Sequence, residues 1–349
     1  MNDVIKSSDY NEKIVNSVLS SISCHARPIT DLKFNKDGDL IFTASKDSTS
    51  AVIKADGTPL GIYKGHEGSI FTISLNSSSS NLLTGSADLS VINWDMETGK
   101  INNRYNVNSI VKCSDNFKDD NLFVTGSDES IGKQKSCNVI DCRSKNIERF
   151  YKLEFNPTGI MVEYAQNFVI FSDDDGFVYK FDLRNNQIVL SNSIHNGNIT
   201  NIKSSLCSTF FVSSSSDAQA KIIDCENLNT VKTFVSEEPI NAADIFSTND
   251  KIVCVGGIDA RDVTTTKGKH GFDTNFFDVI TTEKIGYFTT HYGTINCVDV
   301  FDAGNMYCSA GEEGLVSIVQ FGEDFKKSWI YKFLIIKNFT YLNYLFIMS

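Results

Sequence analysis

One spacing recurs through the chain and limits how the chain can fold. Four of the five histidines lie 22 residues before an acidic residue. A constant interval between the same residue types, spread over most of a chain, indicates a repeated structural unit. The four pairs are His25 and Asp47, His66 and Asp88, His195 and Asp217, and His291 and Glu313.

The copy between residues 65 and 95 is the most complete. It begins with Gly65-His66 and ends with Trp94-Asp95, and short segments rich in β-branched and aromatic residues lie between them. This pattern resembles the WD repeat, a four-stranded propeller blade. Buried polar groups need hydrogen-bond partners. We therefore expect a relay from the His66 imidazole to the Asp88 carboxylate, completed by Trp94 and a second-strand hydroxyl, either Ser86 or Thr84.

Degenerate copies fill the rest of the sequence. Residues 22–325 divide into seven units of about 43 residues, inside the ~40–45 residues typical of this repeat. We predict an all-β, seven-bladed WD-repeat β-propeller with four-stranded blades over residues 13–325. The seventh unit lacks a fourth strand, and residues 14–22 can supply it. The N-terminal strand would then close the ring and remove the exposed strand edges.

The remaining segments are predicted to lie outside the ring. Residues 1–12 form a flexible extension, and residues 326–349 form an apolar tail. Lys332 and Lys337 interrupt the tail, which argues against a membrane span and favours contact with a partner. Met1-Asn2-Asp3 begins no secretory signal, so a cytoplasmic location is expected.

A histidine, an acid and a serine also occur together in hydrolase active sites. Four copies at constant spacing favour a structural role, because an enzyme needs one site. The nine cysteines show no zinc-like spacing. We therefore expect no catalytic residue, no metal and no cofactor.

The charge of the chain disfavours one class of partner. The formal net charge is −11 and the pI is about 5.0. Affinity for nucleic acids depends on Lys and Arg contacts to phosphates, so direct binding of RNA or DNA is disfavoured.

Three segments are more specific than the general repeat. They are LTGSADLSVINWDMETGK at residues 83–100, GGIDARDVTTT at 256–266, and HYGTIN at 291–296. With Gly311-Glu312-Glu313-Gly314, they closely resemble the WD-repeat subunit I of eukaryotic translation initiation factor 3. The resemblance covers about residues 20–325. The sequence departs from the pattern at Cys24, where the repeat has glycine before histidine, and in the loss of Trp from most blades.

The resemblance implies a non-catalytic scaffold in a complex that binds the small ribosomal subunit and supports scanning. It implies docking to a C-terminal helical segment of the factor's large scaffold subunit, designated B, and contact with the subunit designated G. Asp224 is the residue expected to meet a basic partner group. An equally open interpretation is that Asp224 is only the terminal acid of its blade.

Two other functions remain open at the level of sequence. One is a general cytosolic WD-repeat adaptor, such as a substrate receptor of a ubiquitin ligase or a signalling scaffold. The other is a hydrolase or sugar-processing propeller. That function requires acids or metal ligands that converge at the central channel, and the sequence identifies no such set.

Overall fold

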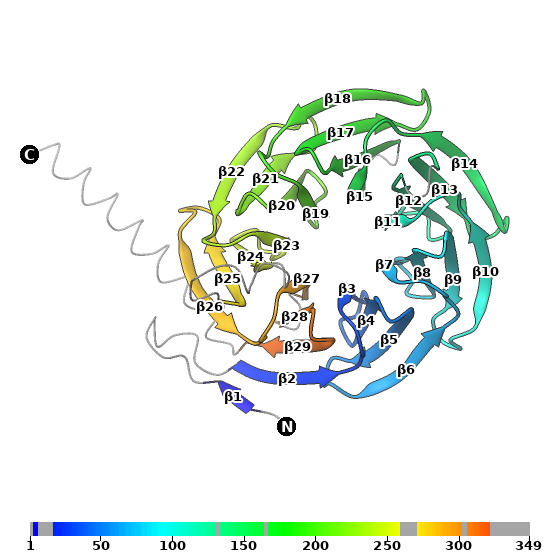
Figure 1. Cartoon of the computed structure of the whole chain (residues 1–349). Helices are drawn as coiled ribbons and strands as arrows, with labels where there is room; N and C mark the ends of the chain where they lie inside the picture. The colour runs from blue at the N-terminus through cyan, green and yellow to red at the C-terminus, as the bar shows by residue number, and fades with distance from the viewer. Residues whose placement is uncertain are drawn as a thin grey trace, which may run out of the picture.

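The computed structural model describes residues 3–5, 17–129, 133–163, 167–258, 271–301 and 306–321. These residues form seven antiparallel sheets arranged in a ring around a central channel (Figure 1). The predicted seven-bladed β-propeller is therefore confirmed. The described part of the chain contains no helix that is long and apolar enough to span a membrane.

Each blade places its first strand at the channel and its fourth strand at the rim (Figure 1). Blade one contains β3 (Ile29–Phe34), β4 (Leu40–Ser45), β5 (Thr49–Lys54) and β6 (Pro59–Lys64). Blade two contains β7 (Ile70–Leu75), β8 (Asn81–Ser86), β9 (Ser90–Asp95) and β10 (Ile101–Asn106). Blade three contains β11 (Val111–Asn116), β12 (Leu122–Ser127), β13 (Ser136–Asp141) and β14 (Asn146–Lys152).

The second half of the ring repeats this order. Blade four contains β15 (Pro157–Val162), β16 (Phe168–Asp173), β17 (Phe177–Asp182) and β18 (Gln187–Ser193). Blade five contains β19 (Ile199–Ser204), β20 (Phe210–Ser215), β21 (Gln219–Asp224) and β22 (Thr230–Val235). Blade six contains β23 (Ile240–Ile245), β24 (Lys251–Gly256), β25 (Asp273–Asp278) and β26 (Lys284–Thr289). Blade seven contains β27 (Ile295–Phe301), β28 (Met306–Gly311) and β29 (Leu315–Gln320).

The fourth strand of blade seven comes from the other end of the chain. β2 (Ser17–Ser23) pairs antiparallel with β29, in a register that runs from Val18 opposite Gln320 to Ser23 opposite Leu315. The predicted closure by the N-terminal strand is confirmed. A further short strand, β1 (Asp3–Ile5), pairs with the outer edge of β2. These three residues belong to the segment 1–12.

Apolar side chains fill the spaces between neighbouring blades. One cluster joins Phe42 and Ala44 of blade one to Ile70 and Ile73 of blade two. The fifth residue of each third strand is buried in every blade. These residues are Ile53, Trp94, Ile140, Phe181, Ile223, Phe277 and Val319. Blade two has a tryptophan at this position, and the other six blades have a smaller apolar residue there.

Two insertions and the tail are only partly described. Residues 128–135 separate β12 from β13, and residues 257–272 separate β24 from β25. Most of the blade-six insertion, residues 259–270, and the tail at 326–349 lie outside the described residues.

The pairing of β2 with β29 predicts that truncation has a sharp threshold. Removal of residues 1–23 deletes β2 and leaves the edge of β29 unpaired. The melting temperature should fall by roughly 10 °C or more, and the protein should aggregate, because an exposed strand edge pairs with other chains. Removal of residues 1–16, which leaves β2 in place, should shift it far less. Equal melting curves for the two truncated proteins would show that β2 does not close the ring.

Candidate functional site

The most complete histidine relay lies in blade two. His66 Nδ1 is 2.8 Å from Asp88 Oδ2, and His66 Nε2 is 2.8 Å from Thr84 Oγ1. The indole Nε1 of Trp94 donates to the same Thr84 oxygen over 2.8 Å. The relay therefore joins the loop before the first strand to the second strand, the third strand and the turn between them.

Thr84, and not Ser86, supplies the hydroxyl of this relay. Ser86 lies at the end of β8, where its hydroxyl bonds to the carbonyl oxygens of Gly68 and Ser69 and accepts the N–H of Asp88. Thr84 lies two residues earlier on the same face of the strand, within reach of both rings. The sequence of blade two alone could not separate the two hydroxyls because both share this face.

Blades one and five repeat the geometry without tryptophan. His25 lies 2.8 Å from both Asp47 Oδ2 and Thr43 Oγ1. His195 lies 3.0 Å from Asp217 Oδ2 and 2.8 Å from Ser213 Oγ.

The carboxylates of these relays also hold a strained turn. Asp88 Oδ1 accepts the N–H of Ser90, and Asp88 Oδ2 accepts the N–H of Glu67. The residue between Asp88 and Ser90 is Leu89, whose φ of 63° is in the left-handed region. This conformation costs a non-glycine residue roughly 1–2 kcal/mol. The same turn position has positive φ at Ser48, Gly176, Ala218 and Gly314.

Hydrogen bonding sets the protonation of the relay acids. Burial opposes ionisation of Asp88, but hydrogen bonds from His66 and Ser90 outweigh it and hold the pKa of Asp88 well below its usual range. The pKa values of Asp47 and Asp217 are lowered by the same balance. An ionised carboxylate can only accept hydrogen bonds, so the histidine Nδ1 is the donor.

Blade seven contains a looser version of the relay. His291 Nε2 lies 2.9 Å from Ser309 Oγ, but Nδ1 and Glu313 Oε2 are 3.6 Å apart, too far for a hydrogen bond. Within the described part of the chain, neither atom has another hydrogen-bond partner. Glu313 instead accepts the backbone N–H of Tyr292. Burial lowers the pKa of His291 to about 4 and raises that of Glu313.

Three blades replace the relay with other contacts. The position of the histidine, four residues before the first strand, is taken by Val107, Leu153 and Ser236. The position of the hydroxyl is taken by Thr125, Phe171 and Cys254, all of which are buried. In blade four, the acid at the turn, Asp175, is exposed. Polar and apolar side chains can therefore both occupy the positions of the relay histidine and hydroxyl.

The relays are structural. Their hydroxyls at Thr43, Thr84, Ser213 and Ser309 have no exposed surface, so a substrate cannot reach them. A nucleophile must contact the reacting atom.

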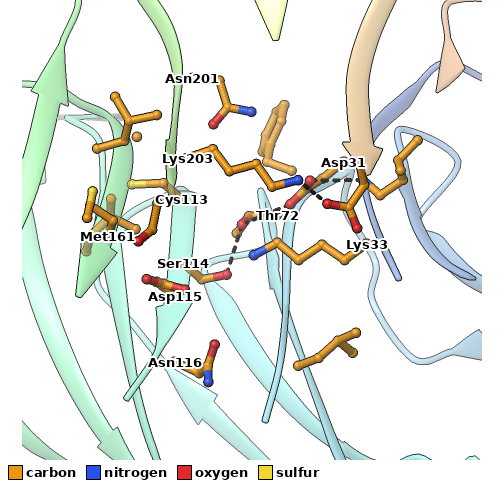
Figure 2. A pocket seen from close by; sticks show the side chains of 18 of the residues that line it. Asp31, Lys33, Thr72, Cys113, Ser114, Asp115, Asn116, Met161, Asn201 and Lys203 are labelled. Carbon is orange, nitrogen blue, oxygen red and sulfur yellow. Dashed lines mark hydrogen bonds and ion pairs between the residues drawn. The ribbon is translucent and has the colours of Figure 1, made fainter. Parts of the chain in front are cut away.

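Acidic residues that the sequence analysis did not identify lie along the central channel (Figure 2). Asp31 Oδ2 accepts the N–H of Ile73 at 2.9 Å, and Asp115 Oδ2 accepts the N–H of Val162 at 2.8 Å. Asp244 bonds to Val300 N–H and Asp299 to Phe34 N–H in the same way. Each of these inter-blade carboxylates joins its first strand to the first strand of the next blade.

Lys203 reaches across the channel to two of these carboxylates. Its Nζ lies 2.8 Å from Asp244 Oδ2 and also contacts Asp299 Oδ1. The resulting group connects blades five, six and seven, and through Phe34 it continues to blade one. Burial raises the pKa of Asp244 to about 6 against the opposing effect of Lys203. Burial also raises the pKa values of Asp31 and Asp115, against the opposing effect of Lys33.

The channel acids act as links between the blades. Each of the four carboxylates is bound to a backbone N–H of a neighbouring blade, so none is presented as a free acid or base. Among the described residues, no group of three or more His, Cys, Asp or Glu side chains could hold a metal ion. The signal for these acids was an aspartate at the fifth position of several first strands, as in Asp115, Asp244 and Asp299.

Asp224 lies at the end of β21 and is half-buried. Its Oδ1 accepts the N–H groups of Glu226 and Asn227, so it caps the turn into β22. Asp141 and Asp182 occupy the equivalent place in blades three and four, where each forms an ion pair with the arginine two residues later. Blade five has the exposed Glu226 at that position. In the described residues, the Asp224 carboxylate forms no ion pair.

Comparison with known proteins places these features in a family. The family model described as EIF3I matches residues 20–331, which contain all of the ring except the first three residues of β2. The chain is 34% identical over 312 residues to eukaryotic translation initiation factor 3 subunit I of Danio rerio, a match that covers 85% of this chain and 94% of that protein.

The chain belongs to the subunit I family of eukaryotic translation initiation factor 3. The subunit I protein of Schizosaccharomyces pombe is 31% identical over 313 residues, with 86% of this chain and 95% of that protein covered. That of Drosophila virilis is 32% identical over 308 residues, with 85% and 96% covered. The resemblance seen in the sequence is confirmed, and the matches indicate no enzymatic family.

The relay of blade two predicts a position-specific loss of stability in this subunit I family member. Asp88→Ala should reduce the free energy of unfolding by about 1–3 kcal/mol, because it leaves His66 and two backbone N–H groups without their acceptor. Asp175→Ala, at the same turn position in blade four, removes an exposed acid without a histidine and should cost less than about 0.5 kcal/mol. Denaturant unfolding measures both, and equal losses would contradict the relay.

His291 predicts a pH dependence of stability. Its pKa is lowered in the folded state, so the unfolded chain binds the proton first. Stability is therefore complete above the unfolded pKa of about 6.5 and falls as the pH drops toward 4. Between about pH 7.5 and pH 5, the low pKa of His291 in the folded state should reduce the free energy of unfolding by roughly 2 kcal/mol. His291→Gln should remove that part of the slope in denaturant unfolding, and an unchanged slope would refute the assignment.

The channel predicts a large effect at Lys203. Lys203→Met leaves Asp244 and Asp299 close together without their cation, and should reduce the free energy of unfolding by about 3–5 kcal/mol. Lys33→Met is the comparison, because Lys33 also points into the channel (Figure 2) and acts on Asp31 and Asp115 by its charge, but forms no close ion pair with the described residues, so its loss should cost less. A comparable loss in both variants would contradict the role given to Lys203.

Proposed function

We propose that the protein is a non-catalytic scaffold subunit of translation initiation factor 3 that docks other subunits of the complex. The observation that supports this proposal most directly is the family match, which extends over nearly the complete ring. A closed ring of rigid blades offers an extended surface of loops and strand edges for protein contacts. We place this activity in the cytoplasm, as part of pre-initiation complex assembly and scanning on the small ribosomal subunit.

The partners in this proposal are the C-terminal helical segment of the large scaffold subunit, designated B, and the subunit designated G. Asp224 is the proposed contact for a basic group of a partner. Two features support it: the carboxylate forms no ion pair within the described chain, and Glu226 adds a second negative charge beside it. The capping bonds from Glu226 and Asn227 use only Oδ1. The same carboxylate can therefore cap the turn and bind a cation.

The chemistry of the described residues supports the non-catalytic part of the proposal. The relay hydroxyls are buried, and the channel carboxylates are bound to backbone N–H groups or to Lys203. The acidic balance of the chain favours basic protein surfaces over nucleic acid as direct partners. Contact with the ribosome is therefore proposed to occur through the complex.

The proposal predicts that charge reversal at Asp224 weakens docking without unfolding the ring. Asp224→Lys should reduce the affinity for the purified C-terminal segment of the large scaffold subunit by about tenfold or more, the range measured for close charge pairs at interfaces. Asp95→Lys is the matched control, because Asp95 caps the same turn in blade two through Thr98 N–H. Titration calorimetry measures both variants, with melting curves as the test of folding.

Two results would count against the proposal in different ways. Equal affinities for the two variants would remove Asp224 from the interface. Failure of the unmodified chain to bind either of the two partner subunits would remove the docking function itself.

A further inference from the structure

The outer strand of blade four differs from those of its neighbours. β18 has the sequence QIVLSNS and contains no charged residue. The outer strands of blades one, two, three, five and six each contain at least one Lys or Arg. These residues are Lys64, Arg104, Arg149, Lys232 and Lys284. Charged side chains, lysine above all, protect edge strands against pairing with other chains, so β18 lacks this protection.

The edge of β18 is open and apolar in the described structure. β18 is the last strand of its sheet, and no described strand pairs with its outer edge. Ile188 and Val189 are 44% and 58% exposed. An exposed apolar edge in a folded protein is a site where another strand can add.

The protein shows how such an edge is covered. β2, with the sequence SVLSSIS, is the other outer strand without a charged residue. β1 pairs antiparallel with its outer edge, with Val4 opposite Val18. Of the two uncharged outer strands, β2 is therefore covered by β1, and no described strand covers β18.

The edge of β18 is continuous with the turn that Asp224 caps. Asn192 Nδ2 donates to the carbonyl oxygen of Leu228 over 2.8 Å, and Leu190 packs against the same cluster as Leu228. Figure 1 shows the end of β18 beside blade five. An uncharged strand edge thus leads directly to the acidic pair Asp224 and Glu226.

We propose that β18 accepts an extended segment of a partner subunit as an added antiparallel strand. The segment has apolar residues along β18 and a Lys or Arg at the end beside Asn192, where it meets Glu226 and lies next to the contact that Asp224 makes with the helical segment of the partner. Backbone hydrogen bonds supply the affinity, and the acidic end supplies the register. This inference rests on the proposed function, because its occupant is one of the partner proteins docked there.

Two variants of equal exposure test the edge. Val189 of β18 and Val231 of β22 are both 58% exposed. Val189→Lys places a charge on the open edge and should weaken binding of the partner subunits by tenfold or more. Val231→Lys should leave binding unchanged, since β22 already contains Lys232. Val189→Thr keeps a neutral β-branched residue and should bind as the unmodified chain does.

Hydrogen exchange of the full chain, free and in complex with the two purified partner subunits, gives the independent readout. The amides of residues 187–193 should exchange at least tenfold more slowly in the complex. A complex in which these amides exchange as in the free chain, or in which both lysine variants bind equally, overturns the strand addition and leaves the docking function standing. No complex with the unmodified chain overturns both. Self-association of the purified chain that Val189→Lys abolishes overturns the partner-subunit occupant in favour of a second copy.

Discussion

The hydrogen bond between a histidine and a turn carboxylate sets the shape of the blades that carry the complete relay. The carboxylate holds the N–H groups of a turn whose central residue is in the left-handed region, as at Leu89. The histidine then joins that turn to the loop that enters the blade. Because this loop comes from the preceding blade, each relay also fixes how one blade follows another. The strain of the turn is offset by contacts that form only in the folded ring.

The inter-blade carboxylates perform a related task at the centre of the ring. The relays lie between the loop and the second and third strands, whereas Asp31, Asp115, Asp244 and Asp299 connect adjacent first strands. Lys203 unites two of them on the side of the ring where β2 and β29 close it. Polar contacts at the channel and at the loop face thus enclose the apolar layers that lie between the blades.

Periodicity predicted the architecture well because it is encoded redundantly. Four of the six intervals between successive first strands are 41 or 42 residues, so a weak copy such as blade six is located by its neighbours. The details that failed depend on geometry within a strand. Thr84 and Ser86 lie on one face, and within the sequence only blade seven separates them, because it has Gly311 at the position of Ser86. Glu313 matches the spacing of an aspartate, but its side chain meets His291 at 3.6 Å.

The channel acids escaped prediction for a different reason. Their partners are backbone N–H groups of the next blade, and these groups have no sequence signature. Asp224 illustrates the same limit. Its sequence position indicates a turn, but only comparison with the equivalent turns of blades three and four shows that it lacks their arginine partner. The edge of β18 was visible in the sequence as an uncharged segment, but only the sheet order shows that this edge is open.

The central claim is that in each complete relay the histidine Nδ1 donates its hydrogen to an ionised turn carboxylate. Nitrogen-15 NMR of histidine-labelled protein at about pH 7.5 tests it most directly, because imidazole nitrogen shifts distinguish the two tautomers and the cation. The account predicts a protonated Nδ1, in slow exchange with solvent, at His25, His66 and His195. Protonation at Nε2 alone, or fast exchange typical of solvent-exposed imidazoles, would contradict it.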